Sequence, residues 1–382
     1  MTPLLLRDEL SARLSGLYGR SATQAVRAPG RVNLIGEHTD YNDGFVLPAA
    51  IERETRIVAA PRTDGVVRLA SVDLGRQTSF DLAHVSTSLD EPWSNYVRGV
   101  AAGLLAAGYP VRGMDALVQG DVPIGAGLSS SAALEMAAVQ AFSAIGGFAV
   151  PPTQAARIGQ HAENVFVGMK TGLMDQLASA LGQPGQVLLI DCRDLTHRLV
   201  PAPEGATILI ADTAVRRRLT SSAYNERREQ CEAASGALGV PALRDATLEM
   251  LERAQLDPIV ANRARHVITE NARVLDTVAA LGRDDLVSVG RLMDASHASL
   301  RDLYQVSSPE LDTMVGLLRA QPGCYGARLT GAGFGGCAIA LIEPGSVERA
   351  IAMVTEAYRS RTGLTPALYP TQAGAGAGPL SE

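Results

Sequence analysis

The sequence predicts an α+β protein of two domains. Short apolar runs separated by turn residues fill the first part of the chain, and helical patterns dominate after about Ala214. The chain has 382 residues, 46% of them hydrophobic, which exceeds the usual size of one domain. We place the boundary near Pro203, so the predicted domains are residues 1–203 and 204–382.

Strands are predicted where short apolar or β-branched runs are bounded by turn residues such as Asp64-Gly65. The predicted strands are 45–51, 55–60, 66–72, 114–119, 186–191 and 207–212. Near the end of the chain, 324–330 and 338–342 predict a hairpin around glycines 331–336. The Ala/Gly-rich segment 373–379 is low in complexity, and we expect it to fray after the last strand.

Helices are predicted where apolar residues recur every three or four positions, which places them on one buried face. The segment after Ser131 keeps this spacing from Leu134 to Ile145. The other predicted helices are 94–107, 151–168, 220–238, 257–281, 284–303 and one opened by Ser308-Pro309-Glu310.

The composition excludes several classes of function. No apolar run approaches the roughly 20 residues that span a bilayer, and the net charge of −6 comes from charges of both signs spread along the chain. This gives no electrostatic footprint for a nucleic acid or an anionic membrane. The four cysteines include no C-x-x-C pair, so neither a disulfide framework nor a zinc cluster is indicated. We expect a cytoplasmic protein with small-molecule partners and no obligatory protein partner.

The lysine content excludes two common kinds of nucleotide site. Of 34 basic residues only Lys170 is a lysine, and it lies in the sequence V-G-M-K-T. A P-loop needs Gly-Lys-Ser/Thr, and a protein kinase needs a strand lysine upstream of its catalytic loop. Any nucleotide must therefore be held by other groups.

The strongest chemical signal is the glycine-rich loop 125–131, which lies between a predicted strand and a predicted helix. Such a loop exposes backbone N–H groups, and the positive end of the helix dipole adds to them. It can bind phosphate without a lysine, and its three serine hydroxyls can add donors or a metal ligand. The alternative is a helix cap whose small residues allow tight packing. A serine-hydrolase elbow is excluded because the final glycine of G-x-S-x-G is absent.

A second glycine motif, G-A-G-F-G-G at 331–336, formally matches G-x-G-x-x-G. Strand-like residues follow it, whereas a dinucleotide fingerprint requires a helix there, so we exclude a Rossmann site. A structural glycine hairpin and a loop whose backbone approaches a ligand both fit the pattern.

Polar residues cluster in two further segments. Arg31, Glu37, His38 and Asp40 lie within ten residues of strand and loop, where they can bracket a polyhydroxylated substrate, although each alone is typical of a solvated loop. No H-E-x-x-H motif supports zinc, while a hard cation with oxygen ligands stays possible. Asp175 begins a short apolar helix, where it is either a functional carboxylate or an acidic first-turn residue favoured by the helix dipole.

Together these segments resemble the galactokinases of the GHMP kinase superfamily. The galactokinase signature is similar to G-R-V-N-L-I-G-E-H-T-D-Y-N-D-G-F-V-L-P at 30–48. The superfamily's phosphate loop and C-terminal glycine motif are similar to P-I-G-A-G-L-S-S-S-A-A at 123–133 and L-T-G-A-G-F-G-G-C at 329–337. Further matches lie at 93–99, 161–163, 172–176 and 221–225, so the resemblance spans nearly the whole chain.

The resemblance implies a two-lobed α+β fold, with mixed sheets and helices in each lobe and the active site in the cleft between them. It also implies transfer of the γ-phosphoryl group of ATP, with Mg²⁺, to the anomeric hydroxyl of D-galactose, the first committed step of galactose catabolism. The alternatives are a kinase for N-acetylgalactosamine, arabinose or galacturonate, and a non-catalytic sensor of galactose and ATP. Sensors lose phosphate-loop residues that are present here.

The resemblance also implies roles for individual residues. The catalytic pair corresponds to Arg31 and Asp175. The galactose-binding positions correspond to Glu37, His38, Asp40, Gly172 and Tyr224. The ATP-binding positions correspond to Gly125, Ala126, Gly127, Leu128, Ser129, Ser130 and Ser131, with Trp93 and Tyr96 near the adenine. The Mg²⁺ ligands correspond to Ser131 and Glu163, with Ser130 as an alternative to Ser131.

Overall fold

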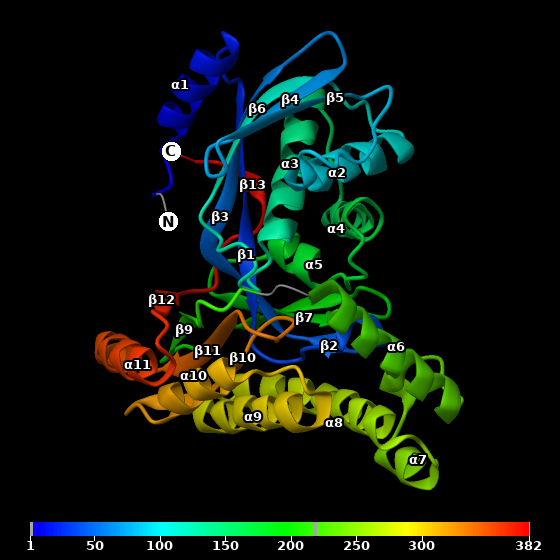
Figure 1. Cartoon of the computed structure of the whole chain (residues 1–382), viewed down its shortest axis with the longest axis vertical. Helices are drawn as coiled ribbons and strands as arrows, with labels where there is room; N and C mark the ends of the chain where they lie inside the picture. The colour runs from blue at the N-terminus through cyan, green and yellow to red at the C-terminus, as the bar shows by residue number, and fades with distance from the viewer. Residues whose placement is uncertain (1–2, 217–219, 382) are drawn as a thin grey trace.

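The computed structural model of the chain describes residues 3–216 and 220–381. Two lobes lie one above the other in Figure 1, each built from strands covered by helices. The predicted α+β class is therefore confirmed. Across the described residues, no helix combines the length and apolar character needed to span a bilayer.

A six-stranded sheet forms the upper lobe, in the order β13-β1-β3-β6-β4-β5. β4 runs parallel to β6, and the other neighbouring pairs are antiparallel. These strands are β1 (Gln24–Asn33), β3 (Pro48–Pro61), β4 (Val66–Ser71), β5 (Arg76–Asp81), β6 (Met114–Gly120) and β13 (Gly378–Pro379).

Helices cover both faces of this sheet (Figure 1). One face is covered by α2 (Asn95–Ala106), α3 (Ser130–Gly146) and α4 (Pro152–His161), and the other by α1 (Arg7–Tyr18). The apolar spacing predicted for α3 is confirmed, since Ala138, Phe142 and Ile145 are buried in the core against the sheet. Below α3 lies α5 (Met174–Leu181), at the junction of the lobes.

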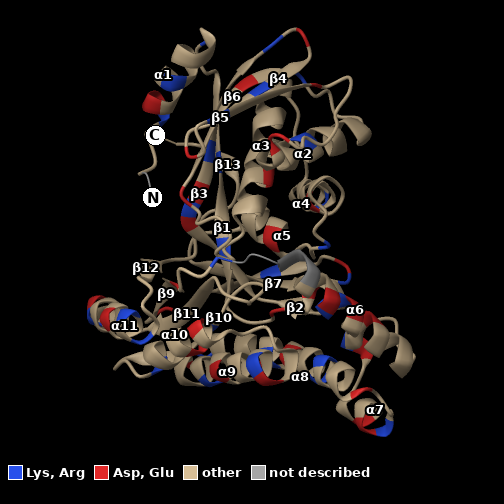
Figure 2. Ribbon diagram, viewed as in Figure 1, with Lys and Arg blue, Asp and Glu red and all other residues tan. Residues whose placement is uncertain are grey.

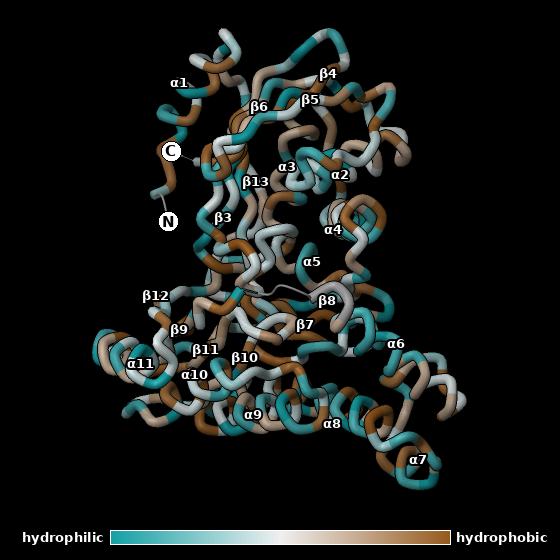
Figure 3. The backbone as a smooth tube through the Cα atoms, in the orientation of Figure 1, coloured by the Kyte–Doolittle hydropathy of each residue, from teal (hydrophilic) through white to brown (hydrophobic). Residues whose placement is uncertain are grey.

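Two sheets and a layer of helices form the lower lobe. Its strands are β2 (Phe45–Val46), β7 (Gln186–Asp191) and β8 (His197–Pro201) in one sheet, and β10 (Cys324–Leu329), β11 (Cys337–Ile342), β9 (Thr207–Asp212) and β12 (Ala367–Thr371) in the other. Its helices are α6 (Thr220–Leu238), α7 (Leu248–Arg253), α8 (Pro258–Leu281), α9 (Leu286–Ser299), α10 (Pro309–Arg319) and α11 (Val347–Thr362). In Figure 3, hydrophilic and hydrophobic segments alternate along α8 and α9, as expected for helices with one buried face.

The core of the lower lobe continues into the upper one. Along β9, Leu209 and Ala211 pack into one cluster while Ile208 and Ile210 pack into another, because successive side chains point to opposite faces. The second cluster also contains Val32 and other residues of the β1 end and the 125–131 loop. This shared core fixes the glycine-rich loop relative to the lower lobe.

Short 3₁₀ and π segments complete the chain, and the π segments extend two α-helices. The 3₁₀ turns are Asp40–Asn42, Pro92–Ser94, Leu243–Asp245 and Pro344–Ser346. The π segments are Ala162–Val167 after α4 and Leu300–Tyr304 after α9. The helices predicted to end near 168 and 303 therefore include these π turns.

Most predicted elements are confirmed, but two strand predictions were wrong in detail. The predicted strands 45–51 and 55–60 are not separate, because β3 runs without a break over Pro48–Pro61. The polar pair Glu52-Arg53 interrupts the apolar pattern, yet the strand continues through it opposite the register shift of β1. β8 was missed because four of its five residues are exposed and carry no alternation.

The prediction that the Ala/Gly-rich end frays was wrong. The N–H of Gly374 donates to Ala50 O (2.9 Å), and the N–H groups of Gly376 and Ala377 donate to carbonyls at the end of α5 (2.7 and 2.8 Å). The chain then pairs with β1 through β13 (Figure 1), and the Leu380 N–H donates to Ala25 O at 3.0 Å. Small side chains allow this backbone to lie between β3 and α5. Although its composition is typical of a flexible tail, the segment is therefore packed against the fold.

The domain division at residue 203 stays a prediction. The break between β8 and β9 falls there. However, β2, β7 and β8 lie in the lower lobe although they precede the boundary, and β13 lies in the upper lobe although it follows it.

Candidate active site

A cavity of about 280 Å³ lies where the two lobes meet, and most of the predicted site residues line it. These residues come from five separate stretches of the chain. They are Arg31, Glu37, His38, Asp40, Tyr96, Gly125, Gly127, Ser129, Ser130, Ser131, Glu163, Gly172, Asp175 and Tyr224.

Three predicted ATP-binding residues do not line this cavity. The side chains of Ala126 and Leu128 are fully buried in the core, so these residues can offer only backbone groups to a ligand. Trp93 lines a second cavity of about 180 Å³, which shares Tyr96 and Ser131 with the first. The side chains of Ser221 and Ser222, in the 221–225 match, lie outside the described residues.

Several wall residues were not assigned to the site from the sequence. They are Ile124, Met169, Thr171, Met174, Gly331 and Ala332. The glycine motif at 331–336 was a usable signal for the last two, because it was recognised as a loop able to approach a ligand. The others are apolar or common polar residues that carry no pattern of their own.

Arg31 and Asp175 form an ion pair in the cavity wall. The Arg31 Nη2 lies 2.7 Å and its Nε 2.8 Å from Asp175 Oδ1, while Nη1 donates to Gly127 O at 2.6 Å. A register shift in β1 between Pro29 and Arg31 re-aims this strand end, as bulges commonly do beside functional sites. Arg31 thus joins the carboxylate at the start of α5 to the glycine-rich loop.

The 125–131 loop has the backbone geometry of an anion site. Ser129 has a left-handed conformation (φ 59°) directly before α3, and Gly125 and Gly127 also have positive φ. Alternating conformations of this kind turn successive N–H groups toward one point, and the helix N-terminus adds positive potential. The Ser129 hydroxyl is buried and has no hydrogen-bond partner within the described residues. The N–H groups of this loop and the Ser129 hydroxyl can therefore donate hydrogen bonds to an anionic ligand in the cavity.

Several carboxylates line the cavity, with Asp40 beside Gly172 and Glu163 beside Ser131. Burial and the nearby Asp175 charge raise the pKa of Asp40 to about 7. Burial and Asp175 likewise raise the pKa of Glu163 to about 7, although hydrogen bonds from Ser131, Thr171 and other groups lower it. The π turn that follows α4 carries Glu163, whose carbonyl accepts from the Gly168 N–H at 2.9 Å. So many carboxylates in one cavity favour ligands that donate hydrogen bonds or bring a cation.

Close approach at Gly172 brings Asp40 into the cavity. A Cβ atom at Gly172 would lie 1.9 Å from Asp40 Oδ2, which is impossible without displacing that carboxylate. For the sugar and nucleotide substrates that the sequence predicts, Gly172→Ala is therefore expected to raise the KM for the sugar at least about tenfold, the loss of roughly one charged hydrogen bond, with little change in the KM for the nucleotide. Steady-state kinetics measure both, with Gly316→Ala as the control, since Gly316 has open space around it. An unchanged sugar KM would show that Asp40 needs no such approach.

The raised pKa of Asp40 predicts that its ionised carboxylate lowers the stability of the fold while it serves ligand binding. Since the ordinary pKa is near 4 and the folded value is about 7, the protonated form stabilises the fold. This contribution is complete below pH 4 and is lost as the pH rises through 7. At pH 8, Asp40→Asn is therefore expected to raise the free energy of unfolding by about 1–2 kcal/mol and to weaken sugar binding severely.

Thermal unfolding at pH 8 and pH 4.5 checks this, because the stabilisation by Asp40→Asn should disappear at the lower pH. Asp43→Asn, in the same turn but exposed, is the control. If Asp40→Asn destabilises the protein at pH 8, the carboxylate is held by favourable contacts and this account of the turn is wrong.

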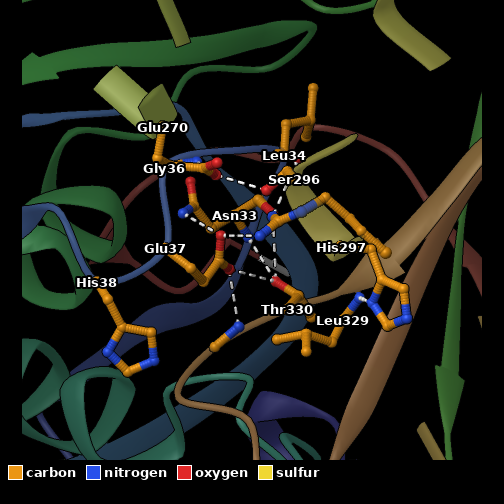
Figure 4. Close-up of polar contacts among 12 residues, drawn as sticks. Asn33, Leu34, Gly36, Glu37, His38, Glu270, Ser296, His297, Leu329 and Thr330 are labelled. Carbon is orange, nitrogen blue, oxygen red and sulfur yellow. Dashed lines mark hydrogen bonds and ion pairs between the residues drawn. The ribbon is translucent and has the colours of Figure 1, made fainter. Parts of the chain in front are cut away.

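Glu37, whose contacts are drawn in Figure 4, and His38 are both held in the cavity wall by contacts within the chain. The Glu37 carboxylate accepts hydrogen bonds from Asn33 Nδ2 and the Gly331 N–H, both at 2.8 Å. The His38 Nε2 lies 3.2 Å from Ala332 O, and its Nδ1 lies 2.7 Å from the hydroxyl of Tyr41. We call residues 30–48, which resemble the galactokinase signature, the sugar-signature segment. This segment and the glycine hairpin between β10 and β11 therefore form one unit.

The second cavity has a mostly apolar character. It is lined by Trp93, Tyr96 and Leu134, by Thr55 of β3 and by the ends of β4 and β6, and it lies beside Ser130 and Ser131. A flat aromatic group can pack there while its anionic end reaches the glycine-rich loop. On the surface, Figure 2 shows Lys/Arg and Asp/Glu interspersed along α8, α9 and α11 in this view.

Comparisons with known proteins place this fold and site in one family. Three family models match: the galactokinase galactose-binding signature over residues 14–61, the GHMP kinase N-terminal domain over 95–183 and the GHMP kinase C-terminal domain over 277–360. The fold and the site therefore define this chain as a GHMP kinase.

Relatives that align over nearly the full length of the chain show which family of GHMP kinases it belongs to. The chain is 47% identical to a galactokinase of Roseiflexus sp. (strain RS-1), over 99% of this chain and 98% of that one. It is 48% identical to a galactokinase of Chloroflexus aggregans, over 94% of both. The crystal structure of Lactococcus lactis galactokinase complexed with galactose matches with a TM-score of 0.94 and 36% identity, over 98% of this chain and 99% of that one. The chain belongs to the galactokinase family, which are ATP-dependent sugar kinases.

More distant structures share the fold alone. A mevalonate kinase superposes with a TM-score of 0.67 at 18% identity, over 92% of this chain.

The galactokinase relatives and the family models confirm the predicted family and the predicted two-lobed fold.

Proposed function

We propose that this chain phosphorylates the anomeric hydroxyl of D-galactose, with ATP as donor and Mg²⁺ as the metal. The observation that carries the proposal is that the Arg31–Asp175 pair, the glycine-rich loop and the sugar-signature residues share one cavity. A galactose-bound relative with the same fold supports galactose as the sugar. We further propose the cytoplasm as the location, where ATP is available.

Asp175 is the proposed proton acceptor. The anomeric oxygen attacks the γ-phosphorus of ATP, the bond from that phosphorus to the β–γ bridging oxygen breaks, and ADP leaves. The sugar proton ends on the Asp175 carboxylate. A sugar hydroxyl is far less acidic than an aspartic acid of pKa ~4, so the proton moves late, as the P–O bond forms.

Arg31 is the proposed partner of that carboxylate and of the transferring group. Its guanidinium contacts both Asp175 and the glycine-rich loop, so it orients the carboxylate and adds positive charge where negative charge develops. The N–H groups of 125–131 supply the remaining electrostatic stabilisation, which replaces the missing P-loop lysine.

The sugar is proposed to be recognised by Glu37, His38, Asp40, Gly172 and Tyr224. The carboxylates accept hydrogen bonds from hydroxyls, so an epimer would leave a buried acceptor unpaired. His38 and Tyr224 lie near each other, with ring centroids 5.6 Å apart, and give the sugar a partly aromatic wall. Trp93 and Tyr96 are proposed to lie beside the adenine in the second cavity.

Mg²⁺ fits the oxygen atoms beside the glycine-rich loop. Ser131 and the Glu163 carboxylate both line the cavity and are hard oxygen ligands; Ser130 is the alternative serine. Among residues 3–216 and 220–381, no group of three or more His, Cys, Asp or Glu forms a metal cage. This agrees with Mg²⁺, which is commonly held by one or two carboxylates plus substrate phosphates. Bound there, the ion would neutralise charge on the phosphates.

A sugar panel tests the proposal. ATP consumption is measured with galactose, glucose, N-acetylgalactosamine, arabinose and galacturonate, with and without a Mg²⁺ chelator, and the product is identified by ³¹P NMR. We expect galactose 1-phosphate as the main product, poor use of glucose and no turnover with the chelator. Equal use of glucose and galactose, or a preference for another sugar of the panel, would contradict the assigned specificity.

A further inference from the structure

Arg328 is a buried cation directly behind the sugar-signature segment. It lies on β10 and is among the largest fully buried side chains, with no exposed surface. Its Nη1 donates to the carbonyl oxygens of Asn33 (3.0 Å) and Leu34 (3.2 Å) at the end of β1. Its Nη2 lies 2.5 Å from Glu37 Oε2. Burying a guanidinium costs free energy unless it is paired, and here its partner is a residue of the cavity wall.

The atoms around the Glu37 carboxylate are hydrogen-bond donors (Figure 4). Asn33 Nδ2 and Arg328 contact Oε2, and the Gly331 N–H contacts Oε1. An ionised carboxylate accepts hydrogen bonds and donates none, so this set of donors fits the ionised form. Glu37 is thereby a pure acceptor at the edge of the cavity.

The Thr330 hydroxyl has two possible acceptors, and one of them is the Glu37 carboxylate. Its hydroxyl lies 3.2 Å from Asn33 O and 3.3 Å from Glu37 Oε1, and it has a single proton to donate. When that proton turns to Asn33 O, Oε1 keeps one lone pair for a ligand. A sugar hydroxyl can then donate to Glu37 without displacing any contact that fixes the carboxylate.

The same carboxylate anchors the glycine hairpin. Gly331 donates to Glu37 and is packed so tightly that a Cβ atom there would lie 2.7 Å from Gly127 O. Gly331 and Ala332 also line the cavity. Holding Glu37 in place therefore holds this hairpin against the phosphate-binding loop.

We propose that Arg328 is a positioning residue that sets sugar affinity by holding Glu37 as an acceptor for a sugar hydroxyl. The inference rests on the proposed role of Glu37 as a galactose ligand. Arg328 itself does not line the cavity, so it acts through Glu37.

The charged groups around Glu37 allow the positioning role of Arg328 to be tested through the pH dependence of activity. Burial raises the pKa of Glu37, Arg328 and the Gly331 N–H oppose the rise, and Glu270 on α8 adds to it. His266, also on α8, lies 3.1 Å from the Glu37 carbonyl, but burial lowers its pKa to about 4, so it is neutral at working pH. Removing the Arg328 charge leaves burial and Glu270 less opposed, so the pKa of Glu37 rises further and the carboxyl takes up a proton.

The test is the pH dependence of Arg328→Gln. At pH 7 we expect kcat/KM for galactose to fall about 10–100-fold, the range for a lost charged acceptor, and to recover in part toward pH 9. The KM for ATP should stay within about twofold. The wild-type protein, measured in parallel, should show no comparable recovery.

Four further variants make the result decisive. Glu37→Gln should impair galactose use at every pH, and the double variant Arg328→Gln/Glu37→Gln should match it, because Arg328 acts through Glu37. Arg328→Lys keeps the charge, so its pH profile should stay near that of the wild type even if Arg328→Gln folds poorly. Arg263→Gln removes another buried arginine of the lower lobe, which contacts Gln230 and Gln305, and should lower stability without changing the pH profile.

Two outcomes would overturn the inference. If the loss in Arg328→Gln is independent of pH and adds to that of Glu37→Gln, Arg328 only stabilises the fold. If Glu37→Gln uses galactose normally, the inference also fails, and the error lies in the proposed ligand role of Glu37 rather than in Arg328.

Discussion

Asp175→Asn is expected to lower kcat by about 10²–10⁴-fold, the usual contribution of a positioned general base, while changing ATP affinity less than about threefold. The amide keeps the size of the carboxylate but cannot accept the sugar proton. It also removes the negative charge that pairs with Arg31 at 2.7 Å. Steady-state kinetics give kcat, and calorimetric titration with a non-hydrolysable ATP analogue gives the nucleotide affinity.

Asp115→Asn is the matched control for this prediction. Asp115 is a fully buried carboxylate of β6 that pairs with Arg20, Arg62 and Arg68, and it does not line the cavity. Its replacement should cost stability and leave the kcat of the folded enzyme nearly unchanged. Near-normal turnover by Asp175→Asn would remove Asp175 from the chemistry.

Arg31→Met is expected to lower kcat by about 10²–10³-fold, the range for loss of one group that stabilises transition-state charge. Arg31→Lys should recover only part of this, because one ammonium cannot reach both Asp175 and Gly127 O as the guanidinium does. The double variant with Asp175→Asn should be little worse than the poorer single variant, since the two side chains act as one unit.

Arg27→Met on the same strand controls for general damage to β1. Arg27 pairs with Glu54 and lies outside the cavity. Its kcat should stay close to that of the wild type. If Arg27→Met and Arg31→Met lower kcat equally, the effect comes from the strand and not from the guanidinium at the site.

The sequence predicted those parts of the fold and site that local rules control. The glycine-rich loop before an amphipathic helix needs only neighbouring residues to form, and it lines the cavity as expected. Helix starts such as Ser308-Pro309 follow from capping, and the Ser308 hydroxyl does accept from the Leu311 N–H. The other site residues were predicted from the family motifs in which they lie.

Contacts between residues far apart in the sequence could not be predicted from local patterns. Arg31 and Asp175 are 144 positions apart, and only the closure of β1 against α5 makes them an ion pair. Arg328 has no sequence pattern that marks it as buried, because its charge is compensated by groups almost 300 positions away. The Ala/Gly strap at 373–379 was misjudged for the same reason: composition indicates flexibility, whereas packing against β3 and α5 orders it.

The most direct test of the central claim is a crystal structure of the protein with galactose, Mg²⁺ and a non-hydrolysable ATP analogue. We predict that the triphosphate lies on the 125–131 loop and that the anomeric oxygen faces its γ-phosphorus at about 3–3.5 Å, within hydrogen-bond reach of Asp175. A triphosphate bound away from that loop, or a sugar whose first carbon points away from Asp175, would contradict the account.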